Sequence, residues 1–308
     1  MLNYKIILVT LSLLLCKQTL SYAESPDKCL ADAKSFTICE RLANQGDDEA
    51  LLILGFLYEW GVGIEKNTDT AEKIYQRLAD KNNKEGFNLL ARVKESQGKK
   101  EEAIQLYQKA ISLGSSSAYY NLGILYRYSD NYINAKEMFE SAIKINHSSN
   151  AMMSLGDLYF DGLGVEQNME LAKKWYNESI QAGSVVAITR LGMLYSALEN
   201  YDEAIKYYQL AIDKGDSTAM NSMGLLYQHG FGVKRNINKS ITFYQRSADN
   251  NNIAGLINLG LMYEEGLGVP QSYEKAIELY ERAYQLGYAD AQLRIDFLKK
   301  NLTRLNKK

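Results

Sequence analysis

The sequence predicts an all-α protein, a solenoid of stacked helix pairs, and three observations carry this prediction. One motif recurs along the chain at spacings of 32 to 36 residues, a period typical of helical repeats. Only 2 of the 308 residues are proline, which helix interiors exclude. Residues suited to helix ends stand at matching places in successive copies. A hydrophobic content of 46% and a charged content of 23% are ordinary for a folded protein and exclude a disordered chain.

Residues 1–23 are predicted to be a secretory signal peptide. Lys5 precedes the apolar run from Ile6 to Leu15, and small residues at Ser21 and Ala23 suit a cleavage site before Glu24. A bilayer span needs about 20 apolar residues, so this run is too short to remain as a transmembrane anchor. We therefore expect an exported protein. It would reach the periplasm or the extracellular space of a bacterium, or the endoplasmic reticulum lumen or the outside of a eukaryotic cell.

Residues 24–46 are expected to form an N-terminal capping helix, with Ile38, Cys39, Leu42 and Ala43 on its inner face. Cys29 and Cys39 form an even pair after signal cleavage, and disulfides persist in exported proteins. A disulfide between them is one hypothesis. The alternative is two small apolar residues on one helix, because cysteines ten residues apart on a straight helix would not meet disulfide geometry.

Each repeat opens with an amphipathic helix, here called helix A. A small residue is followed four residues later by leucine or methionine, then usually by glycine, with an aromatic residue a further turn on, as in Ala151, Leu155, Gly156 and Tyr159. Such spacing places the side chains along one stripe of a helix. The pattern predicts seven repeats, at about 47–82, 83–114, 115–146, 147–183, 184–215, 216–251 and 252–287.

A second helix, helix B, follows in each repeat with a small residue and an aromatic residue four later, as in Ala172 and Tyr176. The recurring helix-A glycine has no side chain, so we expect helices A and B to approach closely there. Four longer copies carry a Gly-x-Gly joint between the helices. A turn-forming function explains these glycines better than a phosphate site, since each joint follows a helix and none leads into Gly-Lys-Ser/Thr.

Capping residues mark the helix ends. The expected N-caps of helix A are Asp47, Asn83, Ser115, Ser148, Ser184, Asp216 and Asn252. The expected left-handed stops after helix B are Asn82, Gly114, Asn146, Gly183, Gly215, Asn251 and Gly287. Residues 288–308 are predicted to be a C-terminal capping helix, over Ala291 to Lys300, followed by a basic tail.

The combined pattern, A-x-x-x-L-G-x-x-Y-x-x-G-x-G-V followed by A-x-x-W-Y-x-x-A and a closing glycine, resembles the Sel1-like repeat. The copy from Ala151 to Gly183 is nearly a full match, and the shorter copies resemble ordinary tetratricopeptide units. This resemblance implies a right-handed α/α superhelix with a concave groove lined by helices A. It also implies a non-catalytic scaffold for protein-protein interaction. Some cysteine-rich members are described as β-lactam-binding or weakly β-lactamase-like, but this chain lacks a cysteine pair in each repeat.

No catalytic, metal or cofactor site is predicted. The two histidines, His147 and His229, belong to no metal-binding pattern. The Ser-x-x-Lys pattern of serine β-lactamases occurs at Ser96, Ser141 and Ser272, but no Lys-Thr-Gly accompanies it, which favours chance matches. The formal net charge of −2 disfavours nucleic acid as a partner. The alternative function is a β-lactam-binding or weakly β-lactamase-like protein of the cell envelope.

A partner is expected to contact the helix-A positions that the repeat pattern leaves free. These residues are Asn88, Arg92, Tyr120, Asn121, Arg127, Met153, Asp157, Arg190, Met193, Asn221 and Asn258. Asparagine amides can pair with the backbone of an extended peptide. The three arginines favour a carboxylate or an acidic segment of a protein or peptide partner. The alternative interpretation is a solvated helix surface with no ligand.

Overall fold

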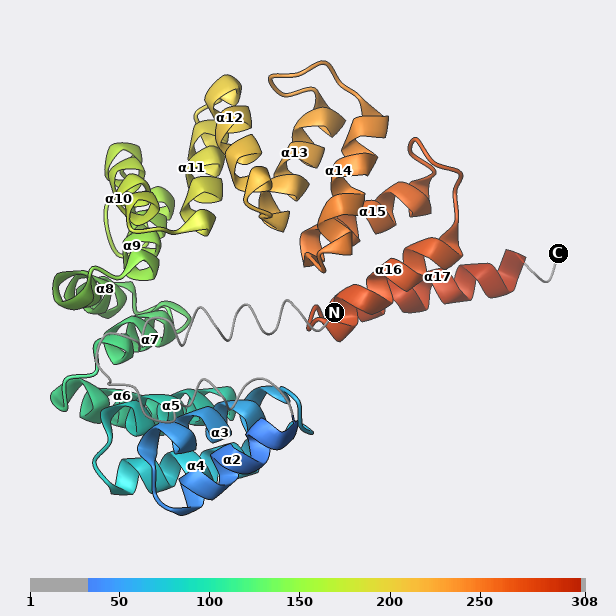
Figure 1. Ribbon diagram of the computed structural model, residues 1–308. Coiled ribbons are helices and arrows are strands. Elements are labelled where there is room, and N and C mark those ends of the chain that lie inside the picture. The colour runs from blue at the N-terminus through green and yellow to red at the C-terminus, as the bar shows by residue number, and fades with distance from the viewer. Residues whose placement is uncertain (1–32, 306–308) are drawn as a thin grey trace. The chain divides into compact units, whose positions relative to one another are not determined.

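A computed structural model describes residues 33–305, so the predicted signal peptide, Cys29 and residues 306–308 lie outside the described residues. Within 33–305 the chain forms helices and no strand (Figure 1). It divides into two compact units, and the division falls between Asn146 and His147. Among the described helices, none is both long enough and apolar enough to cross a membrane.

The first unit is a series of helices in which each packs against the next in the chain (Figure 1). Its helices are α2 (Ala33–Asn44), α3 (Asp48–Trp60), α4 (Thr68–Asp80), α5 (Lys84–Ser96), α6 (Lys100–Ser112), α7 (Ser116–Arg127) and α8 (Tyr132–Asn146). Helices α3, α5 and α7 are helices A, and α4, α6 and α8 are their helices B. The lone helix α2 packs on α3 in the manner of a helix B.

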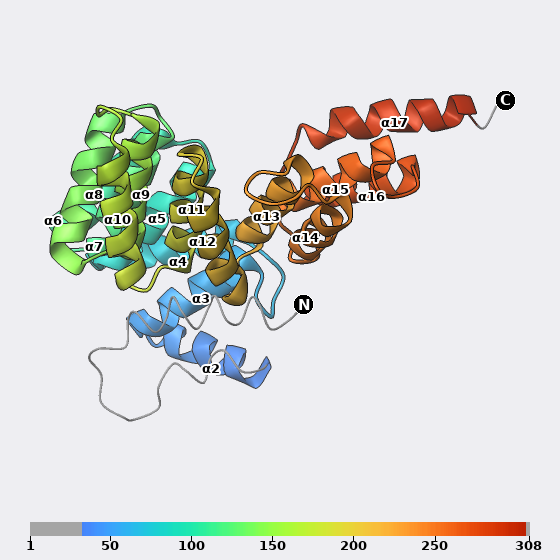
Figure 2. The same cartoon turned by 90° about the horizontal axis from the view of Figure 1, so that it is seen from above.

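The second unit repeats this arrangement (Figure 2). Its helices A are α9 (Ser149–Asp161), α11 (Val185–Ala197), α13 (Ser217–His229) and α15 (Ile253–Glu265). Its helices B are α10 (Met169–Gln181), α12 (Tyr201–Asp213), α14 (Ile237–Asp249) and α16 (Tyr273–Gln285). The last helix, α17 (Ala291–Leu305), lies along α16 in both views and extends past the predicted end at Lys300.

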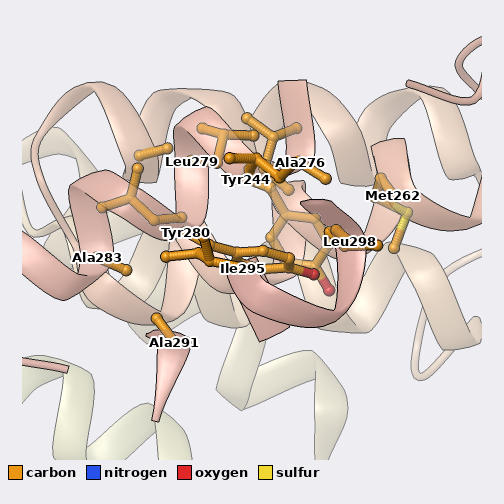
Figure 3. Packing of buried hydrophobic residues seen from close by; sticks show 13 residues of the cluster. Tyr244, Met262, Ala276, Leu279, Tyr280, Ala283, Ala291, Ile295 and Leu298 are labelled. Carbon is orange, nitrogen blue, oxygen red and sulfur yellow. The ribbon is translucent and has the colours of Figure 1, made fainter. Parts of the chain in front are cut away.

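The core of each unit consists of the small and aromatic columns that the repeat pattern predicts. In the last pairs of the second unit, Tyr244 and Tyr280 are buried beside Leu279, Ile295 and Leu298 (Figure 3). Burial of these rings and leucines removes apolar surface from water, the main driving force for stacking neighbouring pairs.

The predicted close approach at the helix-A glycines is confirmed, and the aromatic ring of helix B fills the space. A Cβ atom built on Gly224 would lie 2.5 Å from Cε1 of Tyr244, and one on Gly156 would lie 2.7 Å from Cε1 of Tyr176. Ordinary carbon contacts are about 3.5–4.0 Å. Glycine is therefore favoured where a core ring lies this close to the helix-A backbone, whereas α5 has Ala91 at the equivalent position, in one cluster with Tyr107.

N-capping of the helices A follows the prediction with one exception. The side chains of six of the seven helix-A N-caps accept a hydrogen bond from the first turn, as Asp47 does from the amide of Ala50 at 2.8 Å. Ser115 does not, because its hydroxyl is used elsewhere: it donates to Oε1 of Glu85 on the preceding helix A at 2.9 Å. Ser115 still occupies the N-cap position.

One predicted stop was wrong, at the junction between the two units. Asn146 is the last residue of α8, and His147 takes the left-handed conformation instead, with φ of 51°. The reason lies in the spacing: 16 residues separate Ala135 of helix B from Ala151 of the next helix A, whereas the other repeats have 15. Helix α8 absorbs the extra residue as an added helical position.

The inner face predicted for the N-terminal capping helix is correct for Cys39 and Ala43, which are fully buried, and wrong for Ile38, which is exposed. Cys39 is disulfide-bonded. Because Cys29 lies outside the described residues, its pairing with Cys39 remains a prediction.

Candidate partner-binding site

The predicted contact residues lie on the helices A of both units. Asn88 and Arg92 are on α5; Tyr120, Asn121 and Arg127 on α7; Met153 and Asp157 on α9; Arg190 and Met193 on α11; Asn221 on α13; and Asn258 on α15. The first five belong to the first unit and the other six to the second. Each unit therefore carries its own stretch of the predicted surface.

The recurring asparagines contact each other across neighbouring helices A. Nδ2 of Asn121 donates to Oδ1 of Asn88 at 2.9 Å, and Nδ2 of Asn258 donates to Oδ1 of Asn221 at 2.7 Å. Asn88 and Asn221 are buried, while Asn121 and Asn258 are half-buried. In each pair the half-buried asparagine therefore donates a hydrogen bond to the buried one. The half-buried amide can still form a further hydrogen bond.

Two of the three predicted arginines are paired within the chain. Nη2 of Arg92 lies 2.6 Å from Oε2 of Glu59 on the preceding helix A, and Nε of Arg190 lies 3.3 Å from Oδ1 of Asp157. Both carboxylates are largely buried. These guanidinium groups already have a counter-ion, so they offer less free positive charge than the sequence suggests.

Each of these carboxylates also accepts a hydrogen bond from the core tyrosine of its own repeat. The hydroxyl of Tyr75 donates to Glu59 at 2.9 Å, and that of Tyr176 donates to Asp157 at 2.8 Å. Burial, together with the negative charge of the carboxylate, raises the pKa of each tyrosine well above its usual value. The hydroxyl therefore stays protonated and remains a donor.

A third copy of this triad lies at the end of the second unit. Glu264 accepts from the hydroxyl of Tyr280 at 3.0 Å and pairs with Nη2 of Arg294 at 2.6 Å. We call the arrangement the carboxylate triad: an acid of one helix A, the tyrosine of its helix B and the arginine of the next helix A. Glu59, Glu264 and Arg294 are not among the predicted residues, although an acid five residues after the helix-A leucine is visible in the sequence.

The other predicted contact residues have neighbours of their own. Tyr120 packs its ring on Phe139 with centroids 6.0 Å apart, and the guanidinium of Arg127 lies 5.7 Å from the ring centroid of Tyr128. Met153 packs against the core beside α10, and Sδ of Met193 lies 3.6 Å from Nη1 of Arg190. These residues contribute to packing as well as to the surface.

A pocket of about 400 Å³ opens on the helix-A surface of the first unit, between α5 and α7. Its lining includes three predicted contact residues, Arg92, Tyr120 and Asn121. The other lining residues are Glu95, Ser96, Tyr107, Ile124 and Tyr128. The structure thus brings part of the predicted set together around one concavity, which we call the α5/α7 pocket.

Glu95 is the acidic residue of the α5/α7 pocket. Its Oε2 accepts from the hydroxyl of Tyr107 at 2.9 Å. Burial raises the pKa of Glu95, while the Tyr107 hydrogen bond and the charge of Arg92 act in the opposite direction. At Asp48 the pKa of the carboxyl is shifted in the opposite direction, because the hydrogen bond from Lys81 lowers it.

A second hollow, of about 460 Å³, lies at the Gly-x-Gly joint between α13 and α14, away from the predicted residues. Lys234, Arg235 and Lys239 line it, together with Tyr227. All three basic residues are exposed, Nε of Arg235 donates to the carbonyl of Gln228, and Nζ of Lys239 lies 5.0 Å from the ring centroid of Tyr227.

The three serines of the Ser-x-x-Lys patterns each bond the backbone of their own segment. Ser96 donates to the carbonyl of Val93, and Ser141 donates to that of Glu137. Ser272 is the N-cap of α16. Across residues 33–305, no group of three or more His, Cys, Asp or Glu side chains is placed to hold a metal ion.

Within each unit, successive helix pairs stack on one another at a period of 32 to 36 residues, which defines the class of helical repeat proteins. Residues 48–83, 149–184, 217–252 and 253–288 match the Sel1 repeat family. Residues 85–113, 116–148 and 186–213 match the tetratricopeptide repeat family. The chain therefore contains Sel1 repeats and, between them, tetratricopeptide repeats. The predicted resemblance is confirmed.

Solved structures agree with this assignment. The chain is similar to c5321, a protective antigen of uropathogenic Escherichia coli with a Sel1-like repeat fold, at 25% identity and a TM-score of 0.52; the match covers 87% of this chain and 60% of that one. It is similar to a Sel1 repeat protein from Oxalobacter formigenes at 26% identity and a TM-score of 0.51, covering 65% and 85%. Yeast Tom70, at 16% identity and a TM-score of 0.60 over 94% of this chain and 60% of that one, shares the fold.

Among characterised proteins, the chain is similar to the ERAD-associated E3 ubiquitin-protein ligase component HRD3 of Candida glabrata. The two are 32% identical over 83 residues, which is 27% of this chain and 10% of HRD3. The chain therefore matches only a small part of that relative. Repeats of both matched families are consistent with a scaffold for protein-protein interaction.

Proposed function

We propose that the protein is an exported, non-catalytic scaffold that binds an extended segment of a protein partner on its helix-A surface. Export is supported by the signal-like segment of residues 1–23 in the sequence. Binding is supported by the repeat fold, in which the residues not used for stacking are the ones free to contact a partner.

The observation that carries this proposal is the α5/α7 pocket. Here side chains from two neighbouring helices A converge on a concavity that already contains Arg92, Tyr120 and Asn121. The partly exposed amide of Asn121 can bond the backbone of an extended segment. Tyr128, with 74% of its surface exposed, offers an aromatic contact at the rim, and tyrosine is enriched at binding hot spots.

The acidic partner segment expected from the sequence is supported less well than the site itself. That expectation depended on Arg92, Arg127 and Arg190, and Arg92 and Arg190 are paired with Glu59 and Asp157. The proposal therefore concerns a protein segment on the helix-A surface and does not require that segment to be acidic.

Site-specific photo-crosslinking in the native host tests the proposal. A photo-reactive amino acid replaces Tyr128 at the rim of the pocket, and Lys109, exposed on helix B α6, is the matched control position. We expect mass spectrometry to identify adducts to one partner at position 128 and none at position 109. Equal labelling at both positions, or no protein adduct at position 128, would contradict the proposal.

No comparison supports the alternative β-lactam-binding function. A chromogenic cephalosporin assay on the purified protein checks it directly, and we expect no turnover. Turnover that disappears in Ser141→Ala would instead establish the enzymatic alternative.

A further inference from the structure

The carboxylate triads show a rule about charge at the helix-A surface. Wherever a core tyrosine donates to a carboxylate in the second unit, the next helix A supplies an arginine, as Arg190 does for Asp157 and Arg294 does for Glu264. Glu59 with Arg92 follows the same rule in the first unit. A buried carboxylate is costly unless it is paired, so the arginine offsets the loss of hydration.

In the pair of α13 and α14, where the next helix A supplies no arginine, the acceptor of the core tyrosine is neutral. Tyr244 donates to the amide oxygen of Gln228. A neutral acceptor is therefore sufficient for the core tyrosine. A negative charge at this position is not needed for the tyrosine itself.

Glu95 departs from this rule within the described part of the chain. It accepts from Tyr107 as the triad acids do, yet it forms no ion pair there. The triad arginines stand one residue before the helix-A leucine or two after it, and on α7 these positions are Asn121 and Ile124. Both residues line the α5/α7 pocket. The pocket therefore lies where the arginine of a complete triad would lie.

We propose that the α5/α7 pocket is a specificity pocket for a basic side chain, lysine or arginine, of the bound partner segment, with Glu95 as its counter-ion. This inference rests on the proposed function, because it names the chemistry that the same site selects. The partner would supply the cation that the neighbouring helix supplies in the other triads.

The charges and surfaces around the pocket fit a cation. Arg92, the other charged residue that lines the pocket, is already paired with Glu59, so its guanidinium is not committed to Glu95. Lys94 is directed to Glu72, at 2.7 Å, and is no counter-ion for Glu95. The rings of Tyr120 and Tyr128 and the side chain of Ile124 offer apolar contact to the aliphatic stem of lysine or arginine.

Binding to peptide pools tests the inference. Fluorescent hexapeptide pools carry a fixed central lysine, arginine, norleucine or glutamate, with random flanking positions, and are titrated against the full mature chain at physiological salt. We expect the lysine and arginine pools to bind about tenfold more tightly than the norleucine pool, a ratio equivalent to about 1.4 kcal/mol. The two basic pools also distinguish an ammonium from a guanidinium ligand.

Two variants locate the effect. Glu95→Gln keeps an acceptor for Tyr107, as Gln228 does for Tyr244, and should remove the preference for basic pools without unfolding the protein. Ile124→Arg places an arginine two residues after the helix-A leucine, where Arg92 stands on α5, and should block the basic pools while raising thermal stability. Circular dichroism checks the fold of both variants.

The outcomes separate this inference from the proposed function. Equal binding of all four pools, or an unchanged preference in Glu95→Gln, would overturn the basic-side-chain pocket while leaving the crosslink at position 128 as support for the scaffold. Absence of binding by every pool would overturn the pocket as well. Absence of a protein adduct at position 128 would contradict the proposed function. As an independent readout, the pKa of Glu95 measured by NMR should fall when the lysine pool is added.

Discussion

The close contact between Gly224 and Tyr244 leads to a quantitative prediction about Gly224→Ala. In an exposed helix interior, alanine is favoured over glycine by about 1 kcal/mol. Here the new Cβ would lie 2.5 Å from Cε1 and 2.6 Å from Cδ1 of a fully buried ring, so the ring or a helix must move by about 1 Å to restore ordinary contact. Overpacking costs about 1–3 kcal/mol, and contacts this short place the cost in the upper part of that range, about 2–3 kcal/mol. After the preference for alanine is subtracted, we expect a net loss of about 1–2 kcal/mol.

A double-mutant cycle separates the clash from the intrinsic preference for alanine. Tyr244 donates to the neutral amide of Gln228, so Tyr244→Ala removes the ring without leaving a buried charge unpaired. In that background Gly224→Ala should become stabilising by about 1 kcal/mol, because only helix propensity remains. Urea unfolding together with hydrogen exchange of the α13 and α14 amides measures both steps. If Gly224→Ala alone is as stable as wild type, the close-contact argument is refuted.

Three further predictions concern charge and backbone conformation. Because burial raises the pKa of Glu95 in the folded state, the folded protein binds more protons than the unfolded chain between the two pKa values, so stability falls as pH rises through that window. In urea unfolding at a series of pH values, the Glu95→Gln variant should not show this decrease in stability. Parallel stability profiles for the variant and the wild type would count against the prediction. Arg294→Leu should lower stability by about 1–2 kcal/mol in thermal unfolding, because it leaves the buried carboxylate of Glu264 unpaired, while the partly exposed arginine keeps the cost moderate. The added change Glu264→Gln should recover most of this loss, and no recovery would argue against charge as the cause. Glu199→Gly should raise stability by about 0.5–1 kcal/mol by relieving a left-handed φ of 57°, whereas Glu199→Ala, which keeps Cβ, should show no such gain in melting temperature.

Much of the fold was predictable because its determinants are local. The N-caps lie within a turn of the amides they bond, as Asn252 does with Gly255, and the left-handed stops follow the preference of glycine and asparagine. The predicted Asn146 stop failed because one inserted residue can be absorbed either by the helix or by the turn. Local preference does not decide between these outcomes, and here α8 took the extra residue and moved the stop to His147.

The candidate site was only partly predictable because its chemistry depends on pairs about one repeat apart. Arg92 reads as a free cation in the sequence, yet it is paired with Glu59, 33 residues earlier in the chain. Glu95 stands five residues after the helix-A leucine, as Glu59 and Glu264 do, but the neighbouring helix A, α7, has no arginine at the triad positions. The position of the acid on helix A was visible in the sequence, but its partner depends on how two helices A pack side by side.

The sequence by itself determined the all-α repeat, its period and its glycine-aromatic core, because each repeat carries the same short-range pattern of small, large and aromatic residues. Only the tertiary structure decided which charges are neutralised and where a pocket opens. Stacking places side chains from successive helices A within hydrogen-bonding distance, and ion pairing depends on that distance and on burial.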